Sequence, residues 1–142
     1  PSKPAGRYFV YTGNRNWGVQ NMEYDATRNF WFLATYTGPK DDFSNFTLMA
    51  VDGNIAPKKE PLVGVEYCKK GNVLTISGRG MVDPNHHSIH GWYFDNASVG
   101  IHALGNNYFY ISHAKKNKPF QSCTAKLYKF VARESYPFTP IK

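Results

Sequence analysis

The sequence predicts an all-β domain built from antiparallel hairpins, and three observations support this prediction. Aromatic residues make up 16% of the 142-residue chain, with ten Tyr, ten Phe and three Trp, and such side chains are enriched in strands. Short apolar runs alternate with clusters of Gly, Asn and Asp, which are typical of turns. No long segment carries the 3.6-residue apolar period of an amphipathic helix. The length is that of one domain.

The N-terminal half is expected to contribute four strands. Each is an apolar or aromatic run that ends at a polar turn, and the turn at 25–28 begins with Asp, which suits a tight antiparallel connection. The expected elements are a strand over 7–12, a hairpin with strands over 18–24 and 29–36, and a strand over 46–51.

The C-terminal half is expected to contribute two more hairpins and a closing strand. The expected elements are a hairpin with strands over 62–67 and 73–77, a hairpin with strands over 99–104 and 108–113, and a strand over 126–131. The segment 57–61 is too charged and too rich in proline for a core element, and 81–96 is expected to be a polar loop.

The three hairpins resemble one another and form the expected repeats 18–53, 64–97 and 100–132. They begin at Gly18, Gly64 and Gly100, so the period is about 40 residues, the length of a β-propeller blade. The predicted architecture is therefore about three blades of a β-propeller-like fold. A compact β-barrel or sandwich is the alternative, because any aromatic-rich antiparallel meander resembles itself.

The run Gly18-Val19-Gln20, followed by Tyr24-Asp25 and an aromatic-rich strand, resembles the blades of bacterial secreted β-propeller-like proteins. Many of these proteins are uncharacterised or loosely grouped with glycan-processing enzymes. The resemblance covers residues 6–131 and implies a secreted or periplasmic location. The Ser-x-Asp-x-Gly-x-Thr-Trp box of sialidases is absent, so no catalytic residue is carried over.

Three blades do not close a propeller, which needs at least four. Residues 1–142 are thus expected to be either a single all-β domain or the C-terminal blades of a larger propeller. In the second case, an upstream chain segment or a homo-oligomer completes the fold.

The candidate binding residues follow the repeat glycines, because the innermost strands of propeller blades border a central channel. Equivalent positions are Gln20, Glu66 and His102, while Trp17 offers a stacking face and Asn21 a further amide. These groups suit hydrogen bonding to a sugar. The alternative is that they satisfy one another and ordered water around the channel.

The function expected from these features is a binding or scaffold module for carbohydrate or another polar ligand. Two alternatives stay open: part of a glycoside hydrolase or lyase active site, and a basic protein-interaction domain whose binding weakens steeply with salt. Enzymatic activity stays undecided, because nothing in the sequence pairs the available acids for catalysis. Those acids are Glu23, Asp25, Asp52, Glu66, Asp83 and Asp95.

Other partner classes are not expected. The net charge is +7, but the basic residues form small groups beside turns, without a recognition helix or a basic stripe, which argues against nucleic acid. No run of eighteen apolar residues exists, so no membrane span is expected.

No cofactor or metal site is expected either. The loop 83–90 is rich in His but matches no metal signature. The sequence leaves open whether Cys68 and Cys123 form a disulfide.

Overall fold

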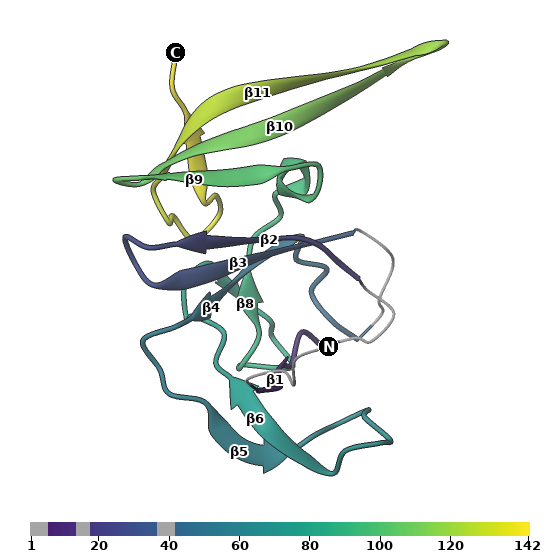
Figure 1. The fold of residues 1–142 in the computed structure, drawn as a ribbon, viewed down its shortest axis with the longest axis vertical. Coiled ribbons are helices and arrows are strands. Elements are labelled where there is room, and N and C mark those ends of the chain that lie inside the picture. The colour runs from purple at the N-terminus through teal and green to yellow at the C-terminus, as the bar shows by residue number, and fades with distance from the viewer. Residues whose placement is uncertain (1–5, 14–17, 37–41) are drawn as a thin grey trace.

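The computed structural model describes residues 6–13, 18–36 and 42–142, and it is all-β, as predicted (Figure 1). One short 3-10 helix, η1 (Asp95–Ser98), accompanies the strands of the described residues. The strands are β1 (Tyr8–Val10), β2 (Val19–Asp25), β3 (Phe30–Thr35), β4 (Leu48–Asp52), β5 (Lys58–Pro61), β6 (Lys70–Leu74), β7 (Met81–Val82), β8 (His90–Gly91), β9 (Ile101–Gly105), β10 (Tyr108–Asn117), β11 (Phe120–Phe130) and β12 (Phe138–Pro140).

The first main sheet is an antiparallel meander in the order β2-β3-β4. A fourth segment runs along β4, because Val51 pairs with Ile76 in an isolated bridge and the Ser77 N–H donates to the Ala50 carbonyl at 2.7 Å. The segment around Ile76 and Ser77 therefore adds a short fourth strand-like element beside β4, although it is not one of the named strands.

The second main sheet is also an antiparallel meander, in the order β9-β10-β11-β12. Strands β10 and β11 pair over their whole length, from Tyr108 with Lys129 to Asn117 with Phe120. The other two strands, β9 and β12, are shorter, so the β10–β11 hairpin extends far beyond them (Figure 1).

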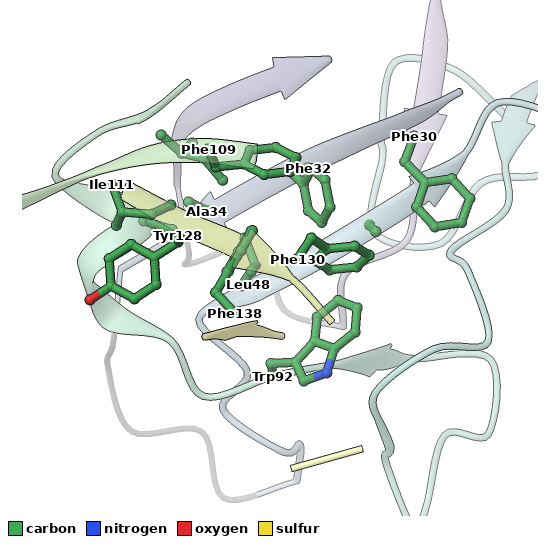
Figure 2. Close-up of a cluster of buried hydrophobic side chains, with 13 residues drawn as sticks. Phe30, Phe32, Ala34, Leu48, Trp92, Phe109, Ile111, Tyr128, Phe130 and Phe138 are labelled. Atoms are coloured by element: carbon green, nitrogen blue, oxygen red, sulfur yellow. The ribbon is translucent and has the colours of Figure 1, made fainter. Parts of the chain in front are cut away.

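The two meanders pack face to face, and the core lies between them. Phe32 on β3 is fully buried and contacts Phe109, Phe130 and Phe138 on the opposing sheet. Its ring meets that of Phe109 edge to face, with centroids 5.5 Å apart, a favoured aromatic geometry. Figure 2 shows this cluster, closed on one side by the buried indole of Trp92.

The sequence pattern explains which face of β3 is buried. Side chains alternate between the two faces of a strand, so Phe30, Phe32 and Ala34 point together into this core, while Trp31 lies on the other face and is 39% exposed. A second, smaller cluster of buried side chains lies on the other side of β4 and contains Phe46, Met49, Ile76 and Ile89.

The remaining strands form two small sheets, β1-β6-β5 and β7-β8. Strand β1 pairs in parallel with β6, and β5 pairs with β6 as an antiparallel edge strand. All four β5 residues are exposed, which is typical of a charged edge that resists further pairing.

The first and third predicted hairpins are confirmed as β2–β3 and β9–β10. The second is displaced, because its strands are Lys58–Pro61 and Lys70–Leu74 rather than 62–67 and 73–77. Pro61 lies at the end of an edge strand, where proline is tolerated. Gly64 then adopts φ +75°, so the chain leaves the extended conformation within the predicted strand.

Repeat 64–97 therefore has a different structure from the other two. It supplies β6 to one sheet and the two-residue strands β7 and β8 to another. The glycines that set the period also differ: a Cβ on Gly18 or Gly64 would meet open space, whereas one on Gly100 would approach Ser112 Oγ to 2.7 Å.

Of the two compact alternatives, the closed barrel does not form from the described strands, and the two main sheets face each other as in a sandwich. Across residues 6–13, 18–36 and 42–142, no helix is long and apolar enough to cross a membrane.

Candidate functional site

The two main sheets meet along a seam between the edge strands β2 and β9, which lie side by side (Figure 1). They share no backbone ladder. Instead, the Glu23 carboxylate on β2 reaches across, and its Oε1 accepts the Ala103 N–H at 2.7 Å. The Nδ1 atom of His102 lies 3.1 Å from the same oxygen. One carboxylate therefore ties the two edges together.

The Asn21 side chain makes the second link across the seam. Its amide nitrogen donates to the carbonyls of Ala97 at 3.1 Å and Ser98 at 2.6 Å. These are carbonyls at the end of η1, which need partners outside the helix. Asn21 thus holds η1 against β2, and its amide donor is occupied in the folded chain.

These two links show that β2 and β9 run in the same direction. Asn21 contacts the residues just before β9, and Glu23, further along β2, contacts residues within β9. Advancing along one strand therefore advances along the other.

Gln20 occupies a β-bulge at the start of β2. Val19 pairs with Thr35 and Asn21 pairs with Ala34, so Gln20 has no partner across the ladder. Its side chain is exposed. Bulges re-aim side chains and are common beside functional sites, so an amide at this position is available to a ligand.

His102 is the exposed polar side chain of β9, with a relative exposure of 69% against 21% for Glu23. The carboxylate contact orients the imidazole at Nδ1 and leaves most of the ring accessible to solvent. Gln20 on β2 and His102 on β9 thus give the two edge strands an exposed amide and an exposed imidazole.

The structure brings three of the five predicted site residues to this seam: Gln20, Asn21 and His102. Glu66 lies in the exposed β5–β6 connection, and Figure 1 shows that hairpin at the opposite end of the molecule from β9. Trp17 lies outside the described residues.

Four of the acids considered for catalysis have structural partners. Asp52 Oδ1 accepts the Asn54 N–H at 2.9 Å. Glu23 accepts the Ala103 N–H across the seam. Asp25 is buried, accepts the Thr27 N–H at 3.0 Å and pairs with Arg28 at 2.9 Å. Asp83 is also buried and is described next. These contacts explain the four carboxylates without catalysis.

Asp83 organises the polar loop that follows β7. Its carboxylate accepts the backbone N–H groups of Ser44, Asn85 and His86, and His86 Nδ1 lies 3.2 Å away. Burial raises the pKa of Asp83, but these hydrogen bonds outweigh it and lower the pKa to about 2. The group is a buried carboxylate that anchors a loop.

The three histidines of this loop also have local contacts. His86 stacks on Phe43 with centroids 4.1 Å apart, while the Nε2 atoms of His87 and His90 lie near the Pro84 and His87 carbonyls. In the part of the chain that the structure describes, no three His, Cys, Asp or Glu side chains are grouped to hold a metal ion. Both cysteines, Cys68 and Cys123, are free thiols.

Two hollows lie beside the β1-β6-β5 sheet, but they are weak candidates for the binding site. One lies against β6 and the other against the outer face of β3, and apolar side chains such as Val73 and Trp31 dominate both. Ligand sites usually add several convergent polar groups to such a lining. The seam carries the more specific chemistry.

Sequence reasoning missed Glu23 as the link between the sheets, because its partner lies 80 residues away. It also missed a concentration of positive charge on the β10–β11 hairpin. The sequence did contain a signal for this positive charge, since no Asp or Glu occurs between Asp95 and Glu134.

Comparison with protein families, curated proteins and solved structures finds no match.

Proposed function

We propose that this chain is a binding module of propeller-like construction that recognises a carbohydrate or a similar polar ligand at the seam between β2 and β9. The observation that carries the proposal is the direction of these strands. In a propeller, the first strand of each blade lies nearest the central channel, and these inner strands run in parallel around it. Two successive meanders whose first strands are parallel neighbours fit that arrangement.

The ligand chemistry is suggested by the exposed groups of the seam. Gln20 offers both a donor and an acceptor, and the His102 ring offers a further nitrogen. Such groups suit the hydroxyls of a sugar, and Trp17 precedes β2 closely enough in the sequence to add an aromatic face. A secreted or periplasmic location agrees with such a ligand.

The proposal also requires more sheets than the two meanders, because a propeller ring has at least four blades. An upstream segment of the polypeptide or another copy of the chain would supply them. Light scattering of the native protein tests this part: a mass above that of one 16.1 kDa chain supports completion by further sheets, and a lone monomer of this mass opposes it.

The ligand is tested by a glycan array followed by calorimetry on the native, assembled protein. Gln20→Ala and His102→Ala should each weaken binding by about tenfold, the effect of losing one net hydrogen bond of about 1.4 kcal/mol. Glu66→Ala is the matched control, because this residue also follows a repeat glycine but lies away from the seam.

Equal loss of binding in the Glu66→Ala control would oppose the seam as the site. Absence of any glycan binding by the assembled protein would oppose the ligand class. Turnover of a chromogenic glycoside that Glu23→Gln abolishes would support the hydrolase alternative instead.

A further inference from the structure

The β10–β11 hairpin continues as a free two-stranded arm after its neighbouring strands end. Strand β9 pairs with residues 108–111 of β10, and β12 pairs with residues 128–130 of β11. Ser112 still donates its N–H to the Gly100 carbonyl at 2.9 Å, and beyond it residues 113–126 pair across the hairpin. Every residue from 114 to 126 is exposed, and Figure 1 shows the arm projecting away from both main sheets.

The arm and its flanks contain nearly all of the excess positive charge. Residues 96–133 include six Lys and Arg and no Asp or Glu, which leaves eleven basic and ten acidic residues in the rest of the chain. A lone hairpin is marginally stable by itself, so an exposed arm without acidic partners suggests a role in binding an anion.

The strand register places lysines on both faces of the arm. Residues opposite each other in an antiparallel pair share a face. Lys126, opposite Ile111, and Lys115, opposite Ser122, therefore lie on the face that continues from the core. Lys116, opposite Gln121, lies on the other face, and Lys118 lies in the turn.

The tip of the arm is apolar. Pro119 and Phe120 follow Lys118 directly, and Phe120 is 77% exposed. The Phe120 ring is not part of either buried cluster of the described residues, so its apolar surface is available to a partner.

We propose that this arm binds duplex DNA by entering a groove, with Lys115, Lys116, Lys118 and Lys126 on the phosphates and Phe120 at the floor. A groove has phosphates on both sides, which matches lysines on both faces of the arm. The major groove is about 12 Å wide and admits a two-stranded ribbon, and an apolar side chain such as Phe can contact the thymine methyl group there. This surface is separate from the seam.

Two other polyanions fit the arm less well. A membrane surface contacts the tip and its surroundings to a depth of about 5–10 Å, whereas the strand residues 113–117 extend about 17 Å. A linear acidic polysaccharide needs cations on one face only. Neither a membrane nor a linear polysaccharide would contact the lysines on both faces of the arm.

The sequence-based expectation against nucleic acid depended on the lack of a basic stripe. Lys126 is eight residues from Lys118 in the sequence, so the two belong to different local groups. The hairpin folds these groups back onto one arm.

The test measures binding of the full chain to a labelled duplex of about 20 base pairs by fluorescence anisotropy at several salt concentrations. Four phosphate contacts predict a slope of roughly −3.6 for log K against log salt. Affinity should therefore fall by roughly 150-fold between about 50 and 200 mM salt. Each single Lys→Ser substitution in the set should reduce the slope by about one.

The matched control has the same loss of charge on the other exposed hairpin. The variant with Lys115, Lys116, Lys118 and Lys126 all changed to Ser should lose duplex binding. The variant with Lys58, Lys59, Lys69 and Lys70 changed to Ser should retain it; these lysines lie on β5, at the end of the β5–β6 connection and at the start of β6. Circular dichroism checks that both variants are folded. Phe120→Ala should weaken binding without changing the salt slope.

Equal weakening in both four-lysine variants would overturn the proposal, because net charge rather than the arm would then determine binding. Tighter binding to heparin or to phosphatidylserine vesicles than to DNA at equal anion concentration would also overturn it and assign the arm to that partner. Gln20→Ala and His102→Ala should leave duplex binding unchanged, so failure here is distinguishable from failure of the seam proposal.

Discussion

Glu23 Oε1 accepts the Ala103 N–H at 2.7 Å across the seam between the two main sheets. Edge strands normally pair through their backbones or are protected from pairing. Here a side chain takes the place of a backbone acceptor. The same carboxylate also contacts His102, which is exposed. Glu23 therefore both holds the two sheets together and positions an exposed side chain of the seam.

Glu23→Ala is expected to destabilise the fold by about 1–3 kcal/mol, because the Ala103 N–H loses a charged acceptor in a half-buried place. Glu23→Gln should cost less, since the amide oxygen still accepts. Urea denaturation measures both free energies of unfolding. Glu60→Ala, on the exposed strand β5, is the control and should change stability by no more than about 0.5 kcal/mol. Similar values for Glu23→Ala and Glu60→Ala would show that the seam does not depend on this bond.

Phe32→Ala is expected to be among the most damaging substitutions in the core, at about 3–5 kcal/mol. The Phe32 ring is fully buried and meets three aromatic rings of the opposing sheet. Phe120→Ala removes the same side chain from an exposed position and should be close to neutral for stability. Thermal or urea unfolding compares the two. A cost for Phe32→Ala near that of Phe120→Ala would mean that the sheets do not pack through this ring.

Local pattern was sufficient to predict the elements that depend on neighbouring residues. Strand β3 was predictable from the alternation of buried and exposed residues at Phe30, Trp31 and Phe32. The β9–β10 hairpin was predictable from its turn, where Asn106 and Asn107 adopt left-handed backbone conformations. Both signals are contained in short segments of sequence. The second hairpin is displaced because β5 is exposed along its whole length, and an exposed strand carries no apolar alternation to fix its ends.

The candidate site depended on contacts that no short segment contains. Asn21 and Glu23 meet residues 76 to 80 positions later, so their roles follow only once the two meanders are packed. Glu66 shares a position in the apparent repeat with Gln20, yet it lies in a connection between strands. The arm was predictable in part. Its positive charge can be counted in the sequence, but its projection beyond the neighbouring strands can be seen only in the structure.

Asp83→Asn is expected to lower stability at neutral pH by about 2 kcal/mol and to flatten the acid limb of the stability curve. The folded pKa of Asp83 is about 2, against an ordinary value of 3.8. A lowered carboxyl pKa contributes stability that is complete above about pH 4 and is lost as the pH falls towards 2. Urea unfolding at several pH values measures this. Asp42→Asn, at an exposed position, should leave the curve unchanged. An unchanged acid limb in Asp83→Asn would contradict the anchoring role.

The His113–Tyr128 pair lies where the arm leaves the core, and it predicts a second pH dependence. The Tyr128 oxygen is 2.9 Å from His113 Nε2 and the two rings are stacked. Burial and the positive charge of Lys126 lower the pKa of His113 below 6.5, and burial raises the pKa of Tyr128. The tyrosine therefore stays protonated and donates its hydrogen to a neutral imidazole.

The sign of this effect follows from the lowered pKa. The unfolded state binds a proton more readily than the folded state, so the contribution of His113 is complete above pH 6.5 and is lost as the pH falls below it. His113→Gln should flatten the stability curve between about pH 5 and 7, whereas His87→Gln, at an exposed position, should not. Lys126→Ser should raise the pKa of His113 towards its ordinary value, measured by NMR titration of the imidazole. A His113 pKa that falls or stays constant in Lys126→Ser would contradict the electrostatic coupling between the arm and the base of the hairpin.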